Sequence, residues 1–425
     1  MQRRPRTKPL LLALLACAVL STSASASTLA VGDERVPDRV ELANGTRVEG
    51  RIVFEDDSKI LLLTGTGEKT FEKKSVKSSR SRARLHDGIF ERWLALDPDQ
   101  LPAILDLMRA CKQTDLLEDA ECFANRALLL DRKNADAHKL LGHRKRGSGF
   151  DFEFRKDRWT SFDQVFVARP DWDQALDVAS MHYVVRTNFA LESAVASALD
   201  LECFYRAFFV LFGKELELRE VVDPMTVEIH ADRGSFPQLA SSRTAYVEPV
   251  RNWVEIDASG GTTGGADRQE LFHEATHQLI AALTHLSFSG AGEVPGWLNE
   301  GLAEYLAAGM NGPPGQKKFS EGALLLDHFK VHAAAKSPYD LSRVLTFEAG
   351  DFIASSKSDL KYAQAYTLVQ FCMEGDSGEH RAGFLDFLRA VWRGKRGSAD
   401  FRKALKIEGK VFEKAWTEHV RANAH

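Results

Sequence analysis

The residues with the clearest chemical potential form the run His273-Glu274-Ala-Thr-His277. On an α-helix, positions 273 and 277 differ by about 40° and lie one turn apart, so both imidazoles project from one face. Two imidazoles placed in this way can bind one zinc ion at about 2.0–2.1 Å. Glu274 is positioned to accept a proton from a zinc-bound water. The run predicts a hydrolytic zinc site, and the alternative is a pair of histidines hydrogen-bonded to neighbours.

A catalytic zinc ion needs a third protein ligand and an open fourth position. His285 cannot supply that ligand, because it lies eight residues beyond His277 on the same helix, about 12 Å further along the axis. A second helix is therefore required. Residues 295–305, Pro-Gly-Trp-Leu-Asn-Glu-Gly-Leu-Ala-Glu-Tyr, provide a candidate, with proline and glycine at its start.

The segment Trp297-Leu-Asn-Glu300-Gly-Leu-Ala resembles the W-L-N-E-G-F-A segment of gluzincin (MA-clan) zinc metallopeptidases, and of their aminopeptidase-N-like family in particular. This resemblance implies that Glu300 is the third zinc ligand. It also implies that Glu304, one turn further on, orients a ligating histidine. The alternative for Glu304 is an acid that faces solvent. The spacer between His277 and Glu300 has 22 residues and is longer than in that family.

The stretch Lys361-Tyr362-Ala-Gln-Ala-Tyr366-Thr-Leu-Val resembles the helix that carries the oxyanion-binding tyrosine of the same family. By that resemblance, Tyr362 donates a hydrogen bond to the tetrahedral oxyanion during catalysis. Tyr366 is a rival for this role. The alternative for Tyr362 is a tyrosine of the hydrophobic core.

The G-x-M-E-N segment that binds a free amino terminus in that family is absent before the zinc helix, so aminopeptidase specificity does not carry over. Asn252-Trp-Val-Glu-Ile-Asp257 stands in its place. In gluzincins the corresponding strand is an exposed edge that pairs with the substrate backbone, and the strand around Trp253 is our candidate for that edge. The resemblance therefore implies a peptide or protein substrate, with endo- and exopeptidase activity both open.

The elements that position these residues come in a definite order, with strands first and helices afterwards. Strand patterns occupy residues 182–186, 226–231, 245–248 and 252–257, and an apolar helix covers 191–212. After the glycine-rich loop 260–265, nearly every segment has a helical pattern. This order predicts an α+β fold with a gluzincin-like domain over residues 172–425, in which a small sheet is followed by a helical bundle.

The first 26 residues have the three parts of a secretory signal peptide: a basic start, an apolar run from Leu10 to Leu20, and small residues up to Ala26. The run has eleven residues, too few to span a bilayer, and no later stretch is a transmembrane candidate. We therefore expect an exported protein, periplasmic or secreted. Leu-Leu-Ala-Cys17 loosely resembles a lipoprotein box, so a lipid anchor at Cys17 is the second interpretation.

Two smaller units are expected before the main domain. Residues 36–80 alternate like short strands around an Asn44-Gly45 turn and resemble a small SH3-like or Sm-like β-barrel. Residues 88–146 are helical, and part of them resembles one tetratricopeptide-type hairpin. Because such hairpins usually need neighbours to form a core, this one should lean on the next domain. Either unit could bind a protein partner.

Composition narrows the function further. The 425 residues are 44% hydrophobic and 27% charged, as in an ordinary folded protein. The net charge is −4, and it becomes −8 without the basic start, which argues against binding to nucleic acid. The sequence does not decide whether four of the cysteines are free or paired: Cys111, Cys122, Cys203 and Cys372.

Together these patterns predict an exported zinc-dependent peptidase in which Zn²⁺ is held by His273, His277 and Glu300. Glu274 would act as the general base. The alternative is a non-catalytic interaction protein that retains a metallopeptidase fold as a scaffold. The presence of the base beside all three ligands favours the enzyme.

Overall fold

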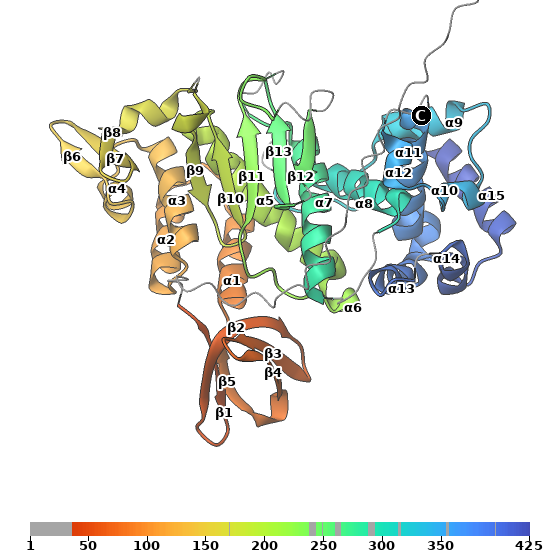
Figure 1. Ribbon diagram of the computed structural model, residues 1–425, viewed down its shortest axis with the longest axis horizontal. Coiled ribbons are helices and arrows are strands. Elements are labelled where there is room, and N and C mark those ends of the chain that lie inside the picture. Colours follow the sequence, from red (N-terminus) through yellow and green to blue (C-terminus); the bar gives the residue numbers. More distant parts are fainter. Residues whose placement is uncertain are drawn as a thin grey trace, which may run out of the picture.

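The computed structural model describes residues 36–169, 171–237, 244–248, 250–259, 265–287, 294–312, 316–353, 357–395 and 397–425. The expected signal peptide and Cys17 lie outside these residues, as does the side chain of His285. The fold is α+β, with three separate sheets and many helices (Figure 1). None of the described helices has the length and apolar character needed to cross a membrane.

The first sheet is antiparallel, and its strand order is β4-β3-β2-β1-β5. Its first hairpin turns at Asn44-Gly45, where Gly45 adopts a φ of +85°, a conformation that favours glycine. The two edge strands do not pair with each other, so the expectation of a closed barrel is wrong. In β4 five of the six residues are exposed and Phe71 is the one apolar side chain, so this edge strand has little apolar surface with which to close the sheet. The strands are β1 (Asp38–Leu42), β2 (Arg47–Glu55), β3 (Lys59–Thr64), β4 (Gly67–Glu72) and β5 (Val76–Arg80).

Four helices follow, and α2 and α3 pack as an antiparallel pair (Figure 1). Small side chains at Ala120 and Ala127 are fully buried and allow the close approach expected of such a hairpin. A three-stranded antiparallel sheet comes next. These elements are α1 (Arg82–Ala95), α2 (Leu101–Gln113), α3 (Leu117–Leu130), α4 (Ala135–Leu140), β6 (Arg144–Arg146), β7 (Gly149–Arg155) and β8 (Arg158–Ser161).

The central sheet has the order β12-β13-β11-β10-β9, and α5 and α7 pack against it (Figure 1). Strand β13 pairs with β11 on one side and β12 on the other. The strand around Trp253 is therefore internal, and our assignment of it as the exposed edge is wrong; β12 takes that place. The elements are β9 (Leu176–Ala179), β10 (Tyr183–Thr187), α5 (Leu191–Phe208), α6 (Lys214–Leu216), β11 (Met225–His230), β12 (Ala245–Glu248), β13 (Trp253–Asp257) and α7 (Arg268–Ser287).

Helices make up the rest of the described chain. Helix α8 packs on α7 and on α12, so it connects the sheet to the helical group (Figure 1). The helices are α8 (Gly296–Met310), α9 (Leu326–Ala334), α10 (Leu341–Val344), α11 (Ala349–Phe352), α12 (Ser358–Glu374), α13 (Arg381–Trp392), α14 (Ser398–Leu405) and α15 (Gly409–Ala422).

One hydrophobic core extends from Ile89 in α1 to Val420 in α15. The helical hairpin therefore shares its buried side chains with the central sheet. The first sheet has a core of its own, formed by Val40, Ile52, Ile60 and Leu62. The four cysteines that the sequence left open are all buried and free of disulfide bonds.

Candidate metal centre

Helix α7 is held on the sheet in one rotational setting. At its start, Asp267 Oδ1 accepts hydrogen bonds from the backbone N–H groups of the next turn, at 2.8 and 3.3 Å. Midway along, the buried Gln278 amide donates to the carbonyls of Thr226 and Asn252, at 2.8 and 2.7 Å. Asn252 returns a hydrogen bond to the Gln278 carbonyl at 3.1 Å. These contacts fix which face of the helix, and hence which residues, point away from the sheet.

Helix α8 lies very close to α12 because of a glycine. A Cβ atom at Gly301 would stand 2.6 Å from the carbonyl oxygen of Ala365, so no larger residue fits without movement. Trp297, one turn earlier, is fully buried and stacks on Phe387 with ring centroids 6.1 Å apart. This packing fixes α8 and directs Glu300 toward α7.

The structure brings together His273, His277 and Glu300, as the sequence predicted. The two Nε2 atoms are 3.1 Å apart. Glu300 Oε2 lies 3.3 Å from Nε2 of His273 and 3.4 Å from Nε2 of His277. Ligands at 2.0–2.1 Å from a tetrahedral ion are separated by about 3.3 Å. The three atoms therefore have the mutual spacing of ligands that share one tetrahedral metal ion.

The surroundings of these atoms favour a cation. Burial opposes a positive charge on His273, but Glu300 and Glu304 outweigh this effect and raise its pKa. Burial likewise opposes the charge on Glu300, but His277 and His273 lower its pKa to about 2. The three side chains are 13 to 16% exposed, so the site is enclosed but open to solvent on one side.

The Glu304 carboxylate contacts the side of the His273 ring that points away from Glu300. Its Oε1 lies 3.3 Å from Nδ1 of His273, whereas the other ring nitrogen, Nε2, faces His277 and Glu300. Glu304 Oε2 lies 3.3 Å from Nε2 of His328 in α9. A carboxylate on the far nitrogen fixes the tautomer and orientation of a ligating imidazole. Sequence reasoning missed His328, because no spacing rule connects a residue of α9 with one on α8.

The remaining predicted residues occupy different surroundings. Glu274 is partly exposed on α7, directly after His273. Tyr362 is partly exposed on α12, and its ring packs edge-on against Phe352 at 5.0 Å. Tyr366 is fully buried, and its hydroxyl accepts a hydrogen bond from the Leu325 N–H at 2.9 Å. Because the Tyr366 hydroxyl already bonds to the backbone, Tyr366 is a poorer candidate than Tyr362 for binding an oxyanion.

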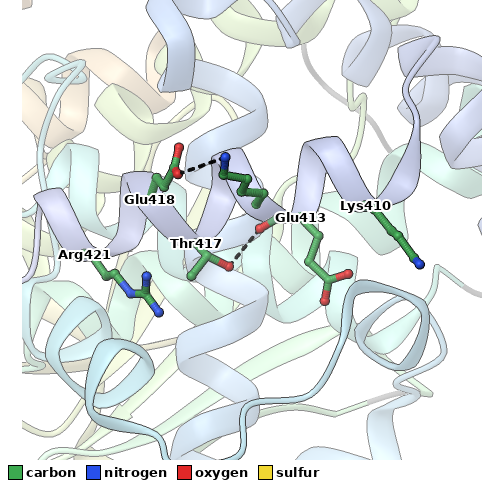
Figure 2. A pocket seen from close by; sticks show the side chains of 6 residues that line it. Lys410, Glu413, Thr417, Glu418 and Arg421 are labelled. Atoms are coloured by element: carbon green, nitrogen blue, oxygen red, sulfur yellow. Dashed lines mark hydrogen bonds and ion pairs between the residues drawn. The ribbon is translucent and has the colours of Figure 1, made fainter.

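A shallow hollow of about 350 Å³ lies along α15, far from these residues in the sequence (Figure 2). Lys414 and Glu418 in its lining pair with each other at 3.8 Å. Its charged lining contains none of the predicted site residues, so it does not compete as an active site. The lining residues are Lys410, Glu413, Lys414, Thr417, Glu418 and Arg421.

Part of the chain is similar to a known protein family. Residues 269–393 match the family described as a protein of unknown function, DUF1570. The matched segment contains His273, His277 and Glu300, together with the helices that carry them. The comparison with curated proteins found no match. The matched family has no known activity, so any functional argument must come from the site itself.

The contact between Glu304 and His328 leads to a prediction. Replacing His328 with Ala removes the partner of Glu304 Oε2, so Glu304 should hold His273 less firmly. A direct partner of a metal-ligating histidine is worth about 10–100-fold in metal affinity. His328 acts one step further out, and we expect a loss below about tenfold. Competition with a zinc chelator measures this change.

The conservative variant His328→Gln is the matched control, because its amide can still donate to Glu304. It should retain most of the wild-type affinity. Equal affinities for the wild type and His328→Ala would show that His328 has no positioning role.

Proposed function

We propose that this chain is an exported zinc-dependent peptidase. The observation that carries the proposal is the similar spacing of three candidate ligand atoms, at 3.1, 3.3 and 3.4 Å from one another, on two packed helices. Two histidines and one carboxylate leave a fourth position open, as in catalytic zinc sites. The signal-like start of the sequence is the support for export.

Each residue would have a distinct role in peptide hydrolysis. A zinc ion bound by His273, His277 and Glu300 would lower the pKa of a water molecule to about 7 and polarise the substrate carbonyl. The Glu274 carboxylate would accept the proton of the attacking water and return it to the leaving amine. The Tyr362 hydroxyl would donate a hydrogen bond to the developing oxyanion.

The edge of the central sheet supports a peptide as the substrate. Among the residues that the structure describes, strand β12 pairs only with β13, so its outer edge offers backbone groups to an added strand. Thr244, just before this strand, donates a hydrogen bond to Glu270 at 2.5 Å, one turn before Glu274 in α7. We therefore propose that β12, in place of the Trp253 strand, aligns the substrate backbone beside the metal centre.

The alternative function is a protein-binding scaffold without catalysis. Metal analysis of the purified chain, combined with cleavage of an unbiased peptide library, separates the two. We expect bound zinc and cleavage that a chelator abolishes and added zinc restores. Zinc binding without any cleavage would favour the scaffold, and absence of bound metal would contradict the proposed chemistry.

Tyr362 provides a more specific prediction. Tyr362→Phe deletes only the hydroxyl, so zinc binding should remain unchanged. An oxyanion-binding donor acts mainly in the transition state, and its loss typically lowers kcat by about 10²–10³-fold. Steady-state kinetics on a cleaved peptide measure this effect, and KM should change much less than kcat.

A thermal melt of the same variant distinguishes the structural alternative. If the hydroxyl served only the fold, its loss would cost about 1–3 kcal/mol of stability and little activity. A destabilised Tyr362→Phe with wild-type kcat would therefore rule out the oxyanion role.

A further inference from the structure

Helix α7 is bonded to the hairpin of β12 and β13 at two points, one on each side of the candidate metal ligands. Near the start of the helix, the Glu270 carboxylate accepts a hydrogen bond from the Thr244 hydroxyl. About two turns later, Gln278 exchanges hydrogen bonds with Asn252, in the turn between the two strands. Residues 273–277 lie between these two points. The hairpin is therefore held alongside the stretch of α7 that carries both histidines and the proposed base.

The two attachments differ in how firmly they hold the hairpin. Gln278 is fully buried and takes part in three hydrogen bonds to β11 and the turn. At the other end, Thr244 is exposed, and its bond to Glu270 is the one described hydrogen bond between α7 and residues 244–248. Its length of 2.5 Å is that of a charge-assisted bond from a hydroxyl to a carboxylate. The position of the start of β12 therefore depends on this bond.

The backbone of β12 alternates between groups that bond to β13 and groups that face the outer edge. The Asp257 N–H donates to the Thr244 carbonyl at 2.6 Å, in a register that places Ala245 opposite Ile256. In an antiparallel pair, the residue after a hydrogen-bonded position turns its N–H and C=O away from the partner strand. Ala245 and Val247 therefore direct their backbone groups to the outer edge. The first of these residues directly follows Thr244.

Glu270 also has a defined place relative to the metal centre. It lies one helical turn before Glu274, and residues four apart share one face of a helix. Burial raises the pKa of Glu270, and the nearby charge of Glu274 adds to this effect. The hydrogen bond from Thr244 opposes it, because the bond favours the ionised carboxylate. One contact thus joins the outer strand of the sheet to the face of α7 that carries the proposed base.

We propose that Thr244 and Glu270 are positioning residues, whose hydrogen bond holds the substrate-aligning edge of β12 at a fixed distance from the metal centre. This inference rests on the proposed peptidase function. Neither side chain touches the reacting atoms. Their bond acts only on substrates that are long enough to pair with Ala245 and Val247, so it favours extended peptides over short ones. Without it, the start of β12 can shift, and the substrate backbone shifts with it.

Steady-state kinetics of the full chain on a long and a short substrate test the proposal. The long substrate is a peptide that the wild type cleaves in the library experiment, and the short one is a blocked dipeptide with the same scissile bond. Thr244→Val removes the hydroxyl and keeps the shape of the side chain. It should raise KM for the long peptide by about tenfold, the equivalent of one hydrogen bond to a charged group. The kcat values and the KM for the short substrate should change little.

Thr244→Ser is the matched control, because it keeps the hydroxyl and should leave KM for the long peptide at the wild-type value. Glu270→Gln keeps a weaker acceptor, so its KM should rise less than that of Thr244→Val. The double variant Thr244→Val/Glu270→Gln should be no worse than Thr244→Val alone, since both changes remove the same bond.

The outcomes separate this inference from the proposed function. A wild-type KM for the long peptide in Thr244→Val would overturn the positioning role. An equal rise in KM for both substrates would also overturn it, because the effect would then not depend on pairing with β12. A wild-type chain that binds zinc but cleaves no peptide would instead contradict the proposed function, and the positioning role would fall with it.

Discussion

Replacing Glu274 with Gln should reduce peptide hydrolysis by about 10²–10⁴-fold, which is the typical contribution of a general base. The amide cannot accept the proton of the attacking water. Zinc content should stay at the wild-type level. Glu274 follows His273 in the sequence but is not one of the three candidate ligands, which are His273, His277 and Glu300. Initial rates on a library-derived peptide and metal analysis of the same sample measure both quantities.

Glu270→Gln is the matched control, since it removes a carboxylate from the same helix one turn earlier. Its Oε1 accepts a hydrogen bond from Thr244, which ties α7 to the start of β12, and the side chain has no role in proton transfer. The Glu270→Gln variant should therefore lose far less kcat than Glu274→Gln, and any effect should appear mainly in KM. A Glu274→Gln variant that hydrolyses peptides at the wild-type rate would refute the mechanism, whatever its zinc content.

Replacing Glu300 with Ala should have the largest effect on zinc binding. Its Oε2 is 3.3 and 3.4 Å from the two Nε2 atoms, so its loss leaves two ligands of the three. We expect the zinc affinity to fall by well over 100-fold, beyond the range for residues that only support a ligand. Chelator competition on the purified variant measures this loss.

Glu304→Ala is the natural comparison, because it removes a carboxylate from the same face of α8. It contacts Nδ1 of His273 and not the metal-facing nitrogen. Its removal should cost about 10–100-fold in zinc affinity. Similar affinities in the two variants would mean that the third ligand is wrongly assigned.

The two results together also decide between the enzyme and the scaffold. An inactive wild type that still loses its zinc on Glu300→Ala would be a metal-stabilised interaction protein. An active wild type that loses activity without losing zinc on Glu274→Gln would be the proposed peptidase. The position of Glu274 beside the ligand His273 leads us to expect the second result.

The local sequence was sufficient to predict those parts of the site that lie on a single helix. The turn of an α-helix alone places His273 and His277 on one face, whatever surrounds them. The strands-first order of the chain similarly predicted an α+β fold, which the structure confirms. The Asn44-Gly45 hairpin also follows from local backbone preferences.

Contacts between elements that are distant in the sequence could not be predicted from local patterns and became visible only in the tertiary structure. The resemblance to gluzincins led us to expect the strand around Trp253 at the edge of the sheet, yet β12 pairs with its outer side. The first sheet likewise stays open, and its edge strand β4 has a single apolar side chain, Phe71, a feature that the number of strands does not reveal. Strand pairing is set by long-range packing, so local alternation does not determine it.

The sequence by itself determined the chemical types and the helical spacing of the candidate metal ligands, because both are properties of adjacent residues. Only the tertiary structure decided that Glu300 reaches the two histidines, since this requires the close packing of α8 that Gly301 allows. The same holds for the contact of His328 with Glu304. Each of these groups joins side chains from separate helices, and only packing of the whole chain brings them within a few ångströms.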